Sequence, residues 1–167
     1  MNKKVKNATS IDSKGIHFRS KVEEKCYSAL KESGFNPKYE QKCYTLLEGF
    51  SPSVPFYVKN TFKRKNNKIQ IVSGTTVVDR RKIKPWTYTP DLYFEYGKFI
   101  IHIEVKGFKN DVVRYKSKLF RLKLESMQTN DPEHIYEFWE IYNLKQLADC
   151  IEHIKNFKQQ SNLRNNV

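Results

Sequence analysis

The sequence is 167 residues long and holds 31 Lys and Arg against 18 Asp and Glu, which gives a formal charge of +13. This length fits one domain with a substantial core, and a hydrophobic content of 38% argues against an intrinsically disordered chain. No apolar run approaches the roughly 20 residues that span a bilayer, and the start MNKKVKN lacks the apolar segment of a secretory signal. We therefore expect a globular protein of the cytoplasm.

The positive charge predicts a polyanionic partner, because Lys and Arg displace the counterions that a polyanion binds. Nucleic acid is the expected partner. A membrane surface is the competing polyanion, but the basic residues are spread over several segments instead of one amphipathic helix. The cysteines are odd in number and far apart, so we expect core thiols and neither disulfides nor a zinc site at Cys26, Cys43 and Cys150.

The chain begins with a lysine-rich segment without periodicity, residues 1–14, which we expect to be a mobile basic arm. Apolar residues then recur at helical spacing, and Ser20 can cap a helix over about 20–33. A strand is expected over about 37–47. The folded domain is expected over 15–157, with a polar tail over 158–167.

A basic insertion follows, because residues 51–89 hold nine basic residues against one acidic residue, a net charge of +8. Two β-branched runs, FYVKNTF and IQIVSGTTVV, flank a polar turn at Asn66-Asn67 and predict a two-stranded hairpin arm over about 51–84. The alternative is an edge hairpin that its lysines protect from aggregation. The candidate DNA contacts in this arm are Lys63, Arg64, Lys65, Arg80, Arg81 and Lys82.

The remaining pattern predicts strands over about 88–96 and 98–106, a helix over 111–125, a strand over 134–142 and a helix over 143–157. The order of elements indicates an α/β or α+β fold with a mixed central sheet flanked by helices. The helix after the second of these strands carries Arg114, Lys116 and Lys118, which can contact backbone phosphates. A solvated helix face is the alternative.

A two-residue turn at Gly97-Lys98 fixes the register of the two strands, so that residues whose numbers sum to 195 face each other. Leu92 then pairs with Ile103 on one face, which favours this register over a one-residue slip. The other face brings Asp91 opposite Glu104, and strand alternation returns Lys106 to the same face.

Two acidic side chains so placed repel each other unless a cation lies between them, and carboxylate oxygens suit Mg²⁺ or Mn²⁺. Such an ion activates water and shields charge in phosphodiester hydrolysis, and the Lys106 ammonium can orient the water or offset charge on the phosphorane. Glu23 on the first helix can complete the site, or it can complete a capping box with Ser20. The alternating charges can also be only the wet face of a strand.

These residues resemble the PD-(D/E)xK nuclease superfamily, and within it the bacteriophage endonuclease I family of Holliday junction resolving enzymes. The resemblance rests on the blocks FRSKVE, ending at Glu23, YTPD, ending at Asp91, and EVKG, starting at Glu104. It implies a restriction-endonuclease-like fold and a phage or bacterial host cell. The catalytic residues would be Glu23, Asp91, Glu104 and Lys106, and the metal-binding set Asp91, Glu104, Val105 and Glu23.

The resemblance further implies one or two Mg²⁺ or Mn²⁺ ions per site, products with 5′-phosphate ends, and a homodimer that acts on branched DNA in recombination. The insertion at 51–84 departs from the pattern, because the corresponding spacing in the family is much shorter. From the site residues and the resemblance together, we expect a Mg²⁺-dependent, structure-selective DNA endonuclease. The alternatives are a restriction-type or transposon-end nuclease and a noncatalytic nucleic-acid-binding protein.

Overall fold

The computed structural model describes residues 9–65, 68–79, 81–106 and 111–164. Within these ranges the chain forms three helices and ten strands. Their bounds are β1 Ile11–Ser13, β2 Ile16–Phe18, α1 Lys21–Glu32, β3 Lys38–Tyr39, β4 Tyr44–Leu47, β5 Phe56–Lys65, β6 Lys68–Asp79, β7 Trp86–Tyr88, β8 Leu92–Tyr96, β9 Phe99–Val105, α2 Asp111–Asn130, β10 Ile135–Ile141 and α3 Leu144–Arg164.

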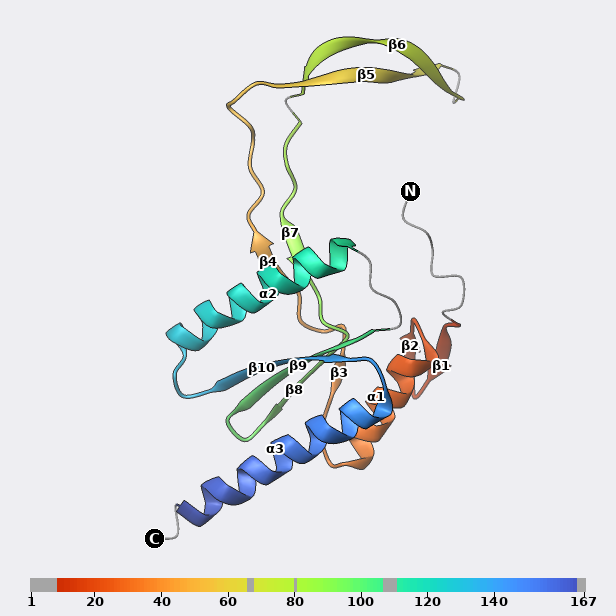
Figure 1. Cartoon of the computed structure of the whole chain (residues 1–167). Coiled ribbons are helices and arrows are strands. Elements are labelled where there is room, and N and C mark those ends of the chain that lie inside the picture. The colour runs from red at the N-terminus through yellow and green to blue at the C-terminus, as the bar shows by residue number, and fades with distance from the viewer. Residues whose placement is uncertain (1–8, 66–67, 80, 107–110, 165–167) are drawn as a thin grey trace. The chain divides into compact units, whose positions relative to one another are not determined.

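The chain divides into two units, which are described separately: a main unit within Met1–Leu46 and Tyr88–Val167, and a ribbon unit within Leu47–Thr87. The main unit is a mixed α/β fold that contains the helices and a four-stranded sheet (Figure 1). This confirms the predicted α/β class with a mixed sheet. Among the described residues, none of the helices combines the length and the apolar character that crossing a bilayer requires.

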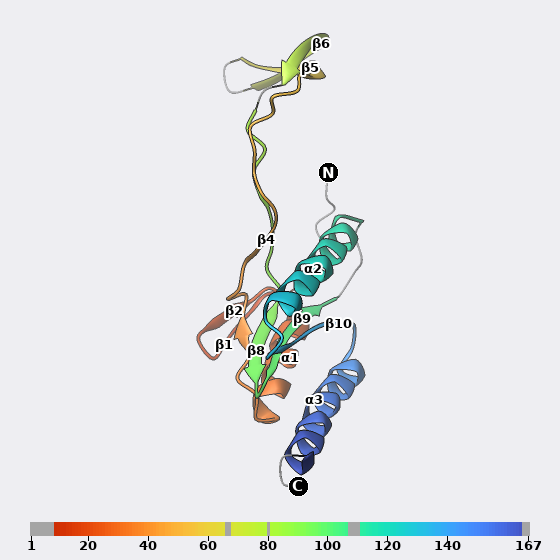
Figure 2. The same cartoon turned by 90° about the vertical axis from the view of Figure 1, so that its left-hand side faces the viewer.

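The sheet of the main unit has the order β10-β9-β8-β3. β9 and β10 are parallel and α2 connects them, whereas β8 is antiparallel to both β9 and β3. α2 covers one face of the sheet, and α1 and α3 lie on the other (Figures 1 and 2). The sheet is therefore the middle layer of three.

Strand alternation divides the core between these layers. On the α1 and α3 side, Leu92 and Ile103 are fully buried with the α3 residue Ile154. On the α2 side, Phe120 is the centre of a smaller cluster with Tyr88. Because successive strand residues point to opposite faces, the polar residues of β9 lie on the α2 side.

The β8–β9 hairpin has the predicted register, with Leu92 opposite Ile103 and Tyr96 opposite Phe99. Gly97 has a φ of 58°, a left-handed conformation that suits glycine at the first turn position. The turn and the apolar face thus specify the same pairing.

Other boundaries differ from the sequence predictions. The predicted strand over 37–47 is broken into β3 and β4 after Glu40, whose φ is 44°. β1 begins at Ile11, inside the predicted basic arm, and pairs with β2 around a Lys14-Gly15 turn. α2 continues to Asn130, and α3 continues to Arg164, through part of the predicted polar tail.

The predicted hairpin over the basic stretch is present in the ribbon unit as the antiparallel pair β5 and β6. Lys65 pairs with Lys68, and the register shifts between Asn60 and Phe62. The predicted turn residues Asn66 and Asn67 lie outside the described residues. Phe50 and Ile83 form a separate antiparallel bridge.

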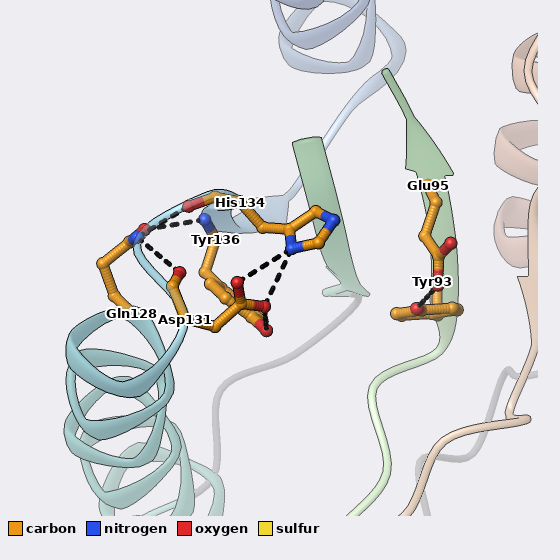
Figure 3. A network of polar contacts seen from close by, with 6 residues as sticks. All are labelled: Tyr93, Glu95, Gln128, Asp131, His134 and Tyr136. Atoms are coloured by element: carbon orange, nitrogen blue, oxygen red, sulfur yellow. Dashed lines mark hydrogen bonds and ion pairs between the residues drawn. The ribbon is translucent and has the colours of Figure 1, made fainter. Parts of the chain in front are cut away.

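The turn between α2 and β10 is held by side chains as well as backbone (Figure 3). The Gln128 side chain donates to the backbone oxygens of Asp131 and His134 at 3.3 and 2.6 Å, and accepts from the Tyr136 N–H at 3.0 Å. Asp131 accepts from the Tyr136 hydroxyl and binds His134. The Gln128 amide therefore fixes the start of β10.

We predict that Gln128→Leu, which keeps the side-chain volume but removes these hydrogen bonds, lowers the free energy of unfolding by about 1–3 kcal/mol. Urea denaturation followed by circular dichroism measures the loss. Thr129→Ala is the matched control, because the exposed Thr129 hydroxyl donates to Glu125 O of its own helix. Equal stability of the two variants would contradict this role for Gln128.

Candidate active site

The three residues at the centre of the predicted site lie together at one end of the sheet. Asp91 immediately precedes β8, Glu104 is near the end of β9, and Lys106 is the first residue after β9. The Asp91 carboxylate accepts the Val105 N–H at 2.7 Å, and the Lys106 ammonium contacts Glu104 Oε1 at 2.6 Å. Asp91 and Lys106 are only 9% and 6% exposed. Both ionisable groups are thus largely removed from water.

The electrostatics of this cluster are unfavourable for a second negative charge. Burial, followed by the charge of Glu104, raises the pKa of Asp91 to about 8, and Glu23 acts in the same direction. The Val105 N–H and the Lys106 ammonium oppose the shift. The acidic groups therefore interact with one another, as the sequence predicted for Asp91 and Glu104.

Glu23 lies in the first turn of α1 and has the capping role that the sequence left open. Its backbone N–H donates to the Ser20 hydroxyl at 3.2 Å, and its carboxylate accepts from the same hydroxyl at 2.9 Å and from the Arg19 N–H at 3.2 Å. Tyr39 on β3 donates to Glu23 Oε2 at 2.6 Å. Glu23 therefore caps the helix, and its charge also acts on Asp91.

Tyr88 is a site residue that the sequence analysis did not find. Its hydroxyl donates to Glu104 Oε2 at 2.7 Å, so that Tyr88 and Lys106 each hold one oxygen of Glu104. The ring is buried and packs against Phe120, with ring centroids 4.6 Å apart. Burial and the charge of Glu104 raise the pKa of Tyr88, which keeps the phenol a donor. Its closeness to Asp91 in the sequence is the only signal, and a packing tyrosine would look the same.

Glu140 is a second residue that the sequence analysis did not find. It pairs with Glu104 in the parallel register of β9 and β10, which extends the row of carboxylates across a third strand. Ser117 on α2 donates to Glu140 Oε1 at 2.7 Å, and Tyr142 donates to its other oxygen. No hairpin turn joins β9 to β10, because the two strands are parallel and α2 lies between them in the chain. Their register therefore cannot be derived by counting residues from a turn, and the sequence did not identify Glu140 as a neighbour of Glu104.

The residues of the predicted metal-binding set have protein partners in this structure. Among the described residues, no three His, Cys, Asp or Glu side chains lie close enough together to hold an ion. Glu104 is bonded to Lys106 and Tyr88, whereas Glu23 is bonded to Ser20 and Tyr39. Val105 meets Asp91 through its N–H. The chemistry of the donors fits a hard cation, because such an ion would offset the burial and the repulsion by Glu104 that together raise the pKa of Asp91.

Two further residues of the main unit are His102, which is a core residue, and Cys43, which differs from its sequence interpretation. His102 on β9 is fully buried, with Tyr44 at 2.7 Å from Nε2 and Glu137 O at 3.2 Å from Nδ1. Burial lowers the pKa of His102 to about 4, so the ring is a neutral core group. Cys26 and Cys150 are buried as predicted, whereas Cys43 is exposed.

The structure describes the side chains of only some of the candidate DNA contacts. Lys82 and Lys118 are exposed, Arg81 is exposed and takes part in a further interaction, and Lys116 is half-buried with an interaction of its own. Those whose side chains lie outside what the structure describes are Lys63, Arg64, Lys65, Arg80 and Arg114. The two predicted groups belong to different units, with 81–82 in the ribbon unit and 116–118 in the main unit.

Comparisons with protein-family models, curated proteins and solved structures found no match for this chain.

We predict that Asp91→Asn stabilises the protein above neutral pH when no divalent ion is present. The raised pKa means that the folded wild type loses stability as the pH rises from about 4 to about 8, whereas Asn has no charge to bury. Thermal melts in EDTA should therefore show a gain of at least about 1 kcal/mol for the variant at pH 9, and no gain at pH 3.

The matched control is Asp149→Asn on α3, for which we expect no such pH-dependent gain, because Asp149 is exposed. A variant at Asp91 that is less stable than wild type at pH 9 would contradict the repulsive cluster.

Proposed function

We propose that this chain is a metal-dependent DNA endonuclease of the PD-(D/E)xK kind, with catalytic residues Asp91, Glu104 and Lys106 and with support from Glu23. One observation carries the proposal: Asp91, just before β8, and Glu104 on β9 meet at one end of the sheet, where burial and then the charge of Glu104 raise the pKa of Asp91 to about 8, and a buried ammonium contacts Glu104. Strongly perturbed carboxylates beside a specific charged partner are characteristic of catalytic sites.

Each residue has a distinct task in phosphodiester hydrolysis. A bound Mg²⁺ or Mn²⁺ ion, one or two per site, would lower the pKa of the attacking water and shield charge on the phosphate. Asp91, Glu104 and the Val105 backbone would hold it, and Glu23 would contribute directly or through water. Lys106 would orient the water or donate to the phosphorane oxygen, because its ammonium is already held at this face by Glu104.

A restriction-endonuclease-like core with an inserted hairpin arm is the fold that this proposal implies. The mixed sheet, with the candidate site at the start of β8 and the end of β9, supports it. DNA is the proposed substrate because the chain has a charge of +13 and exposes Lys82 and Lys118. The leading task is resolution of Holliday junctions or other branched DNA by a homodimer during recombination, in a bacterial or phage-infected cell.

A noncatalytic nucleic-acid-binding protein is the second candidate. The observation that favours it is that the carboxylates of Glu104 and Glu23 already have hydrogen-bond donors without an ion. Under this alternative the charged residues of the sheet end would be purely structural, and divalent ions would change nothing.

We predict that the protein cleaves a four-way junction in Mg²⁺, and that Lys106→Met abolishes cleavage while junction binding remains within about twofold. Methionine keeps most of the buried aliphatic length and removes the charge. Gel electrophoresis of labelled junctions measures cleavage, and gel shifts in EDTA measure binding. Lys98→Met is the matched control and should cleave like wild type, because Lys98 is exposed in the turn of the same hairpin.

The same assay includes a linear duplex with the arms of the junction. Cleavage of this duplex at a defined sequence would identify a restriction-type or transposon-end nuclease instead. Binding without any cleavage, identical in Mg²⁺ and in EDTA, would support the noncatalytic protein.

We also predict that Tyr88→Phe weakens binding of Mn²⁺ by roughly 5- to 10-fold, which corresponds to about 1 kcal/mol, the net contribution of one typical hydrogen bond. The phenol holds Oε2 of Glu104, so its removal lets the carboxylate rotate while the buried ring still packs on Phe120. Isothermal titration with Mn²⁺ gives the affinity, and the Mg²⁺ concentration for half-maximal cleavage should rise in parallel.

Tyr136→Phe is the control, because its hydroxyl also donates to a carboxylate, Asp131, but in the turn between α2 and β10. Equal Mn²⁺ affinity in the two variants would show that Tyr88 does not position Glu104 for an ion.

A further inference from the structure

The ribbon unit, Leu47–Thr87, exposes several large apolar side chains. Among its residues with described side chains, none belongs to the buried core, and the large apolar side chains are exposed to solvent. Those exposed by 43% or more are Leu47, Phe50, Val54, Phe56, Tyr57, Ile83 and Trp86. Two-stranded ribbons are marginally stable by themselves, so a ribbon with this many exposed apolar side chains is a candidate binding surface.

The exposed side chains are distributed over the paired strands. Phe50 and Ile83 exchange two backbone hydrogen bonds, of 3.0 and 2.8 Å, so their side chains lie on the same face of the ribbon. Phe56 and Tyr57 are consecutive in β5, 63% and 64% exposed, and therefore point to opposite faces. Aromatic rings are thus accessible on both faces.

The charge of the same segment selects the chemistry of the partner. Residues 47–87 hold nine Lys and Arg against Glu48 and Asp79, a net charge of +7. This charge opposes contact with a second copy of the same ribbon or with a basic protein. A partner must therefore offer negative charge together with flat apolar faces.

Unpaired nucleotides offer both, whereas the paired bases of a duplex are stacked on each other and hide their faces. We propose that the ribbon unit binds single-stranded or unpaired nucleotides, with Phe56, Tyr57 and Trp86 stacking on bases and the basic residues neutralising phosphates. This inference goes beyond the proposed cleavage and does not depend on it. For a branched substrate, it assigns to the ribbon the recognition of unpaired bases.

The first test is fluorescence of Trp86, one of two tryptophans in the chain. Titration of the full-length protein with an unlabelled 15-nucleotide oligothymidine in EDTA should quench the emission, and this quenching should be largely absent in Trp86→Phe. Trp139, whose Nε1 is bonded to Glu137, supplies the unchanged remainder. Equal quenching in wild type and Trp86→Phe would overturn the assignment of Trp86.

The second test is the affinity of Phe56→Leu/Tyr57→Leu, which keeps apolar bulk on the ribbon but removes two rings. For each base that loses its stacking ring, single-strand binding should weaken by about 5- to 150-fold. Duplex binding should stay within about twofold. The salt dependence should be unchanged, because no cation is removed. Leu144→Ala, which alters a similarly exposed side chain at the start of α3, is the control and should bind like wild type.

Three outcomes overturn the proposal. The double variant and the wild type could bind single strands with equal affinity, or the wild type could bind duplex more tightly than single strand. The third is that the wild type binds an acidic polypeptide such as polyglutamate in preference to oligothymidine. Cleavage is measured separately in Mg²⁺. A protein that cleaves junctions but fails these tests disproves only the ribbon inference, and one that passes them without cleaving disproves only the nuclease.

Discussion

The pairing of β8 with β9 is the interaction on which the candidate site depends. A two-residue turn at Gly97-Lys98 and a buried apolar face fix this pairing, and one consequence is that Asp91, Glu104 and Lys106 meet at the same end of the sheet. A slip by one residue would send Glu104 to the core face and Ile103 to the α2 side. Folding of the hairpin and assembly of the site are therefore the same event.

The fold stabilises this concentration of negative charge with neutral donors from several elements. Tyr88 on β7, Tyr39 on β3 and Ser117 on α2 each donate a hydroxyl to a glutamate, and Lys106 supplies a buried positive charge. Hydroxyl donors hold carboxylates in place without neutralising them, so the electrostatic repulsion persists in the folded state. Such unrelieved repulsion is what the proposed cation-binding site requires.

The sequence predicted what local rules determine. Strand alternation and a two-residue turn were enough to derive the β8–β9 register, and the helical periodicity after Ser20 was enough to place α1. The contributions of Tyr88 and Glu140 depend on β7 and on the parallel pair of β9 with β10, which form between segments distant in the sequence. The burial of His102 likewise depends on α2 covering the sheet. No periodicity in a single segment contains that information.

The contrast among the three cysteines has a practical consequence. Burial raises the pKa of Cys26 to about 11 and that of Cys150 to about 12, so at neutral pH both remain protonated thiols that electrophiles reach poorly. Cys43, between β3 and β4, is exposed. The unmodified chain therefore offers one preferred attachment point for a maleimide dye or spin label, a few residues before the ribbon begins. Distances from this point to a labelled oligonucleotide would report the placement of the ribbon in solution.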